Sequence, residues 1–274
     1  MHSALLASLL TLGLYALASI SGFYGLIFHK RGWIRTGFYF SLGAFLCQTL
    51  ALVLGFHRLF PGGPSSGAYL QLLAWFSLLC GLVAWKTLKN ESLILFAALF
   101  GMLLFLVSLP FLNIRVSLPE PLSAPFFALH IGSIFLGLGC LSIAFVASLI
   151  FIILEKKIKS KKIITGFWVN MPALTILDRI NFFGVVLAFP LFTIGLTFGF
   201  IWSKPVFDGA ASDPKIIVSL LIWALLAALF HNRLVLGWRG KKPAYLTIAI
   251  FILCIFSILI VNFLLPTSHD FMRI

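Results

Sequence analysis

The chain has 274 residues, of which 61% are hydrophobic and only 10% are charged. A soluble domain carries roughly 25% charged residues, so the composition excludes an ordinary soluble enzyme, a disordered chain and a nucleic-acid-binding protein. The formal net charge of +13 does not indicate nucleic acid either, because the Lys and Arg residues form short clusters between apolar runs. The composition predicts a polytopic membrane protein embedded in a lipid bilayer.

Eight apolar stretches are long enough to cross the ~30 Å hydrocarbon core of a bilayer, which takes about 20 helical residues. Helices are expected because backbone groups in lipid must be paired within their own segment. The sequence therefore predicts an all-α polytopic bundle of about eight transmembrane helices. No flexible linker interrupts the chain, so we interpret residues 1–274 as a single integral membrane domain. The eight stretches cover residues 4–28, 38–60, 67–86, 92–113, 125–153, 179–202, 214–236 and 243–265.

The connection between the fifth and sixth stretches is strongly basic. It carries five lysines between residues 156 and 162. Further along it, Met171-Pro172 is followed by apolar residues at helical spacing up to Asp178. This pattern predicts a short helix on the membrane surface before the sixth span.

The basic residues also predict how the chain is oriented. Fifteen of the 20 Lys and Arg residues lie in or beside the connections that follow the odd-numbered spans. Cytoplasmic connections carry an excess of Lys and Arg. Both termini are therefore expected on the extracytoplasmic side of the membrane.

Histidines are the candidate ligands in this chain. His130 lies near the outer start of the fifth span, His269 follows the eighth span on the same side, and His231 lies near the inner end of the seventh. Ionisable groups in spanning segments usually face a cavity or a cofactor, and imidazole is a common axial ligand of haem iron. Two outer histidines on different helices, with aromatic residues such as Trp202 nearby, suit a flat apolar ring that carries a metal. The alternative is that each histidine is a packed or interfacial polar side chain.

No catalytic residues are predicted. The chain has 7 acidic residues and contains no HExxH, GxSxG or phosphate-binding loop motif. Paired carboxylates suited to acid–base chemistry are missing as well. We therefore expect no independent catalysis by this protein.

Several motifs occur in a characteristic order over roughly residues 60–272. In that order they resemble the cytochrome c assembly family, which includes CcsA and CcmC and the smaller HemX and YpjD. The motifs are His130 with the glycines that follow it, the run from Gly195 to Trp202, Asp213-Pro214-Lys215, the run Phe230-His231-Asn232-Arg233, and His269.

The resemblance implies a haem-handling protein of c-type cytochrome biogenesis in the bacterial cytoplasmic (inner) membrane. Non-covalently bound b-type haem would have His130 and His269 as axial ligands at an extracytoplasmic site, for presentation to apocytochrome c. The loop that starts at Trp202 and ends near Asp213 would lie against the ring. A haem within the membrane would have His231 as one ligand, and a ResB/CcsB-like membrane partner would take part.

The loop over residues 202–215 departs from the family pattern, because it contains one tryptophan where relatives resembling CcsA have several. In this respect the chain is closest to the HemX/YpjD branch. That branch implies an accessory protein that senses or buffers haem, or regulates tetrapyrrole synthesis, without delivering haem. A membrane scaffold or transporter without a cofactor is a further alternative, in which Asp213 only caps the helix that starts at Pro214.

Overall fold

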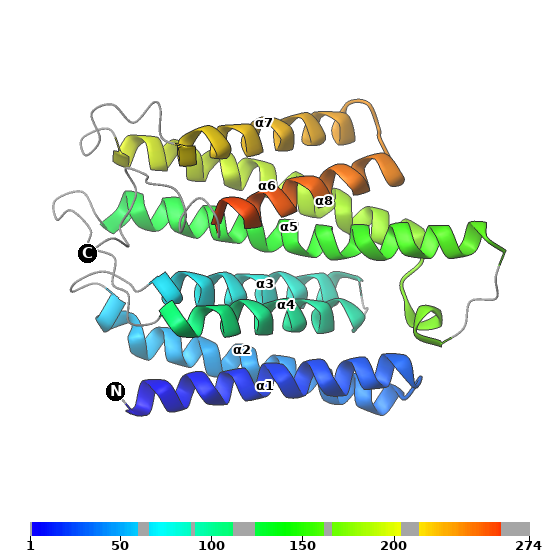
Figure 1. The fold of residues 1–274 in the computed structure, drawn as a ribbon, viewed down its shortest axis with the longest axis horizontal. Coiled ribbons are helices and arrows are strands. Elements are labelled where there is room, and N and C mark those ends of the chain that lie inside the picture. The colour runs from blue at the N-terminus through cyan, green and yellow to red at the C-terminus, as the bar shows by residue number, and fades with distance from the viewer. Residues whose placement is uncertain are drawn as a thin grey trace. The chain divides into compact units, whose positions relative to one another are not determined.

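The computed structural model describes residues 2–59, 66–88, 91–111, 124–161, 166–203 and 214–258 (Figure 1). Every regular element in these ranges is helical, which confirms the all-α prediction. The α-helices are α1 (His2–Ile27), α2 (Arg31–Leu59), α3 (Ser66–Leu88), α4 (Ser92–Ser108), α5 (Ala124–Lys159), α6 (Leu174–Ser203), α7 (Pro214–Leu234) and α8 (Lys241–Phe256), and the short 3-10 helices are η1 (Leu109–Phe111) and η3 (Gly166–Asn170).

Each of the eight predicted stretches overlaps one α-helix. Six of the helices in the described ranges, α1, α2, α3, α5, α6 and α7, are long and apolar enough to cross a membrane. Helix α4 is a shorter apolar helix, and α8 has 16 residues. In the predicted fourth stretch, residues 92–113, the α-helix ends at Ser108 and the 3-10 turn η1 follows. Pro110 lacks the N–H that would bond to the carbonyl four residues earlier, so the α-helix does not continue through it.

The predicted position of the surface helix just before the sixth span is wrong. Helix α6 begins at Leu174 and runs without a break, so residues 174–178 form its first turns. The short helix of this connection is η3, which precedes Met171-Pro172. Phe167 of η3 lies 6.4 Å from the ring of Phe23 in α1 and 6.4 Å from that of Phe96 in α4, so aromatic packing holds η3.

The helices form two compact groups, which are described separately. The first group covers Met1–Val116 and Ile152–Leu177 and contains α1 to α4. In it, α1 packs along α2 and α4, and α3 packs along α4. A polar chain joins three of these helices: the buried Tyr15 hydroxyl donates to Gln48 Oε1 (2.7 Å), and Gln48 Nε2 donates to the carbonyl of Gln71 (2.7 Å).

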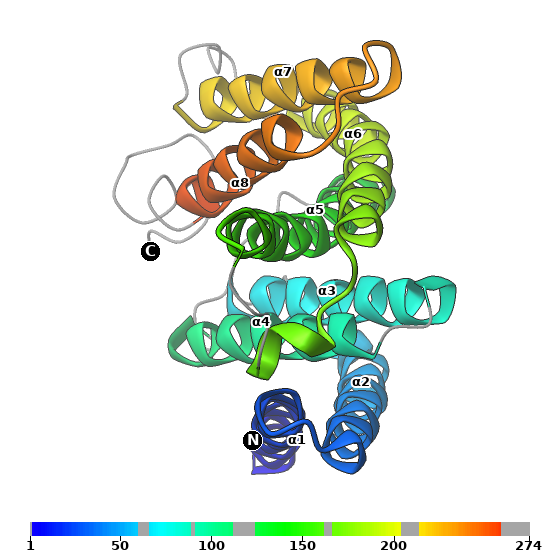
Figure 2. The ribbon, with the colours of Figure 1, turned by 90° about the vertical axis from the view of Figure 1, so that its right-hand side faces the viewer.

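The second group covers Ser117–Phe151 and Asp178–Ile274 and contains most of α5 together with α6, α7 and α8 (Figure 2). Helices α5 and α6 run antiparallel along a seam of small residues. For example, a Cβ atom on Gly184 would lie 2.7 Å from the Cβ of Ala144. Trp223 of α7 donates to the Thr193 hydroxyl of α6 (3.0 Å), and α8 contacts both α7 and α5. The four helices thus surround a common core, in which α5 and α7 run in one direction and α6 and α8 in the other (Figure 1).

Candidate functional site

His130 lies in the second turn of α5, partly buried, with its ring against α6. Its Nδ1 atom is 2.6 Å from the carbonyl oxygen of Gly195. A carbonyl oxygen can only accept a hydrogen bond, so Nδ1 carries the proton in this contact. The neutral ring then has its basic lone pair on Nε2, the nitrogen through which such an imidazole coordinates iron.

Gly199 lies one helical turn beyond Gly195 and also faces the ring of His130. A Cβ atom at Gly199 would lie 2.7 Å from both Cε1 and Nδ1 of His130, which is closer than real Cβ contacts allow. The imidazole therefore occupies the space that a larger residue at position 199 would fill. The carbonyl and the missing side chain together hold the ring against the backbone of α6.

His231 has a different environment. It lies in the last turn of α7 with an exposed side chain, whereas the buried face of this helix consists of Ile222, Leu226, Leu229 and Arg233. It therefore does not point into the core of the second group. Because α5 and α7 run in the same direction, His130 near the start of α5 and His231 near the end of α7 lie at opposite ends of this group (Figure 1).

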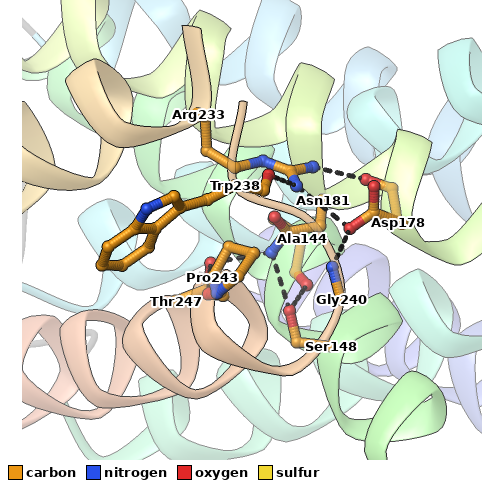
Figure 3. A network of polar contacts seen from close by, with 9 residues as sticks. All are labelled: Ala144, Ser148, Asp178, Asn181, Arg233, Trp238, Gly240, Pro243 and Thr247. Atoms are coloured by element: carbon orange, nitrogen blue, oxygen red, sulfur yellow. Dashed lines mark hydrogen bonds and ion pairs between the residues drawn. The ribbon is translucent and has the colours of Figure 1, made fainter. Parts of the chain in front are cut away.

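An ion pair occupies the end of the second group where α7 finishes (Figure 3). Arg233 Nη1 lies 3.0 Å from Asp178 Oδ1, and the Arg233 side chain is only 1% exposed. The guanidinium also donates to the carbonyl oxygens of Trp238 and Asp178, both at 2.7 Å, and lies 5.3 Å from the ring centroid of Phe182. The carboxylate neutralises this buried cation, and carbonyl oxygens accept hydrogen bonds from both of its terminal nitrogens, which offsets part of the cost of burying a charge. The buried Nε atom has no hydrogen-bond partner among the described residues.

The carboxylate of Asp178 also binds the turn from α7 to α8. The backbone N–H of Gly240 donates to Asp178 Oδ1 (2.9 Å). Gly240 has a φ of 78°, in the left-handed region that glycine adopts without steric strain. One acidic side chain at the start of α6 therefore holds both the end of α7 and the start of α8.

Asn181 extends this network into the core. Its Nδ2 group donates to the hydroxyls of Ser148 (2.8 Å) and Thr247 (2.7 Å). Those hydroxyls donate in turn to the carbonyls of Ala144 and Pro243 one turn earlier, so each must accept from Asn181 and the amide orientation follows. Asn181 thus links α5, α6 and α8 (Figure 3).

Three of the predicted site residues cannot be placed against His130. Trp202 belongs to the last turn of α6, one turn beyond the glycines that face His130, but its side chain is outside the described part of the structure. Asp213 and His269 lie outside the described residues altogether. The pairing of His130 with His269 therefore stays a prediction. Pro214 is the first residue of α7, as its rigid φ angle predicts.

Sequence reasoning did not find the roles of Gly195 and Gly199, or the pair Asp178–Arg233. The two glycines have the Gly-x-x-x-Gly spacing that lets another group approach a membrane helix closely. Acidic residues are rare here, and Asp178 borders an apolar span, so its position could have indicated a basic partner. Neither signal identifies its partner, because the contacts join residues 65 and 55 positions apart in the chain.

These features define a class of protein: a multi-pass helical membrane protein with an ion pair and a hydrogen-bond network inside its second helix group. The chain belongs to the family described as Cytochrome C assembly protein, which matches residues 65–269. This confirms the resemblance inferred over roughly residues 60–272. The match begins near α3 and includes His130, His231 and the Asp178–Arg233 pair.

Similar proteins carry the name "Cytochrome c biogenesis protein CcsA". The chain is 27% identical over 278 residues to the one from Guillardia theta, an alignment that covers 92% of this chain and 91% of that protein. It is 38% identical over 96 residues to the one from Prochlorococcus marinus (strain NATL1A), covering 35% of this chain and 30% of that protein. The chain is 35% identical over 103 residues to the one from Pyropia yezoensis, an alignment that covers 37% of this chain and 32% of that protein.

Proposed function

We propose that this protein handles haem in the biogenesis of c-type cytochromes, holding it at an extracytoplasmic site for presentation to apocytochrome c. The observation that carries the proposal is the bond from His130 Nδ1 to the Gly195 carbonyl, in a chain of the cytochrome c assembly family. Metal-ligating histidines commonly donate their second ring N–H to a carbonyl in this way. The donor chemistry of His130 therefore fits an axial ligand of haem iron.

In this proposal His130 and His269 would hold the iron of non-covalent b-type haem. Trp202, in the last turn of α6, and Asp213, just before α7 in the sequence, would border the ring. His231 would be one ligand of a second haem within the membrane. Because His231 is exposed on α7, the other ligand of that haem has to come from outside the core of the second group. A ResB/CcsB-like partner would supply it. No catalytic residue is assigned, because the thiols of apocytochrome c form the bonds.

The proposed topology follows from charge. Eight membrane crossings, with both termini outside, put 15 of the 20 basic residues on the cytoplasmic side. The His130 end of α5 then faces the extracytoplasmic side, and the Arg233 end of α7 faces the cytoplasm. The corresponding location is the cytoplasmic (inner) membrane of a bacterium.

The test is haem binding by protein purified in detergent. The change His130→Asn removes the ligating nitrogen but retains an N–H that can donate to Gly195, so the helices should still pack. We expect His130→Asn and His269→Asn each to abolish the Soret band of low-spin haem. The matched control is His29→Asn, because His29 is exposed and has a φ of 56°, which asparagine tolerates. Unchanged spectra in both site variants would contradict the proposal.

A second candidate is an accessory protein of the HemX/YpjD type that senses or buffers haem without delivering it. The observation that favours it is the single tryptophan in residues 202–215, because fewer indole rings are available to stack on a porphyrin. Reconstituted cytochrome c maturation separates the two candidates. A haem-loaded protein that supports no attachment of haem to apocytochrome c would favour the accessory role.

A further inference from the structure

The residues around His130 restrict both which ring nitrogen is protonated and where the imidazole ring lies. The ring contacts α6 at two glycines one turn apart, through a hydrogen bond at Gly195 and through close packing at Gly199. The first contact determines which nitrogen carries the proton. The second determines how near the ring lies to the helix axis.

The hydrogen bond selects one tautomer. The Gly195 carbonyl belongs to the backbone of α6, so it cannot change rotamer or become a donor. Its 2.6 Å contact with Nδ1 stabilises the form protonated at that atom and leaves Nε2 as the basic nitrogen. A donor N–H bonded to a carbonyl also makes an imidazole a stronger electron donor to a metal.

The space at Gly199 limits the position of the ring. With any side chain at residue 199, the ring would have to move away from α6 or α6 away from α5. The first movement breaks the bond to Gly195. By contrast, a Cβ atom on Gly132, two residues beyond His130 in the same helix, would meet no atom within 4 Å.

We infer that Gly195 and Gly199 form a seat for the His130 imidazole, which selects Nε2 as the ligating nitrogen and makes Gly199 a positioning residue. The inference rests on the proposed haem-binding role of His130. It adds the atom that binds iron and the reason for glycine at position 199. Neither glycine touches haem in this account, since both act through the ring of His130.

The first test compares Gly199→Ala with Gly132→Ala, using purified protein titrated with haemin. Both changes replace glycine by alanine in an α-helix of the second group, so their effects on helix propensity match. We expect Gly199→Ala to bind haem about 10- to 100-fold more weakly, as when a supporting contact of a metal ligand is lost. The remaining haem should shift from low-spin to high-spin, and its reduction potential should rise, whereas Gly132→Ala should match the wild type.

The outcomes separate the inference from the proposed function. If His130→Asn abolishes low-spin haem but Gly199→Ala leaves affinity and spin state unchanged, the seat is disproved and the haem site stands. If His130→Asn has no effect either, the proposed function fails and the inference fails with it. A merely destabilised Gly199→Ala protein would lower the unfolding temperature without changing the spin state of bound haem, and this result also counts against the seat.

A second test needs no substitution at Gly199. In wild-type protein labelled with ¹⁵N-histidine, solid-state NMR without haem should show one neutral imidazole protonated at Nδ1, and this signal should disappear in His130→Asn. A His130 ring protonated at Nε2 would overturn the inference even if Gly199→Ala cannot be purified.

Discussion

The two ends of the second helix group hold their helices together by different means. Where α5 begins, α6 approaches it through glycines: the imidazole of His130 fills the space beside Gly199, and Ile134 fills the space beside Gly195. Where α7 ends, the buried guanidinium of Arg233 joins α6, α7 and the turn to α8. Close packing at one end sets the position of an imidazole ring, whereas charge pairing at the other end sets the position of helices.

This difference explains why the two histidines of the group differ. His130 is held by a backbone carbonyl, while His231 lies on the exposed face of α7, with its near neighbour Arg233 on the buried face. The polar network near His231 therefore supports the helix end and not the imidazole. A ligand at His231 has to approach from outside this core.

The largest expected effect follows from removing one partner of the buried pair. Asp178→Ala leaves the Arg233 charge buried without its carboxylate, so we expect a loss of about 3–5 kcal/mol in the free energy of unfolding. Denaturant unfolding in detergent micelles measures it, with Arg239→Ala at an exposed cation as the control. The double change Asp178→Leu with Arg233→Met should recover part of the lost free energy of unfolding, because no unpaired charge stays buried. A loss below about 1 kcal/mol for Asp178→Ala would contradict a stabilising charge pair.

The next effect concerns the glycine seam. Gly184→Ala puts a Cβ atom 2.7 Å from that of Ala144 and 2.9 Å from the carbonyl of Cys140, so α5 and α6 must separate. We expect a loss of about 1–3 kcal/mol, typical of overpacking. Gly132→Ala, which meets open space, should be neutral or slightly stabilising in the same unfolding assay. Equal effects of the two changes would show that packing at Gly184 is not tight.

A smaller effect is expected from the amide network. A double-mutant cycle of Asn181→Ala and Thr247→Val isolates the hydrogen bond between these side chains. Such bonds between membrane helices average about 0.6 kcal/mol, and we expect a coupling energy of this order from unfolding measurements. Strict additivity of the two changes would show that the bond contributes nothing.

The smallest effect belongs to the ion pair between Lys159 and Glu155 in the last turns of α5, where the cation is exposed. The Lys159 side chain is 66% exposed, and the pair has i,i+4 spacing with a 2.7 Å contact. Lys159→Ala should lower the free energy of unfolding by less than about 0.5 kcal/mol, since water and salt screen such pairs. An effect comparable to that of Asp178→Ala would mean that burial of the cation does not distinguish the two pairs.

Sequence patterns located the helices because each one depends on its own residues. The first residue of α7 is Pro214, as predicted, whereas α5 continues beyond the predicted end at residue 153 to Lys159. Two local predictions, the end of α4 and the helix after Pro172, were wrong. Pro110 shortened α4, and Pro172 separates η3 from α6 instead of preceding a separate surface helix.

The candidate site was predictable only in part. His130 was identified from its type and its depth in an apolar span, but its hydrogen bond requires α6 to lie antiparallel against α5 in one register. The same holds for Arg233, whose partner Asp178 was visible in the sequence without any indication that the two meet. The orientation of His231 also depends on which face of α7 the other helices cover.

The sequence by itself determined that this chain is an all-helical membrane protein of the cytochrome c assembly family, because apolar length, charge distribution and motif order are properties of linear segments. Only the tertiary structure decided which nitrogen of His130 is free of its proton, why residues 195 and 199 are glycines, and where the buried charge of Arg233 is neutralised. Those outcomes depend on distances between helices, which close packing fixes to within an ångström and which no local pattern encodes.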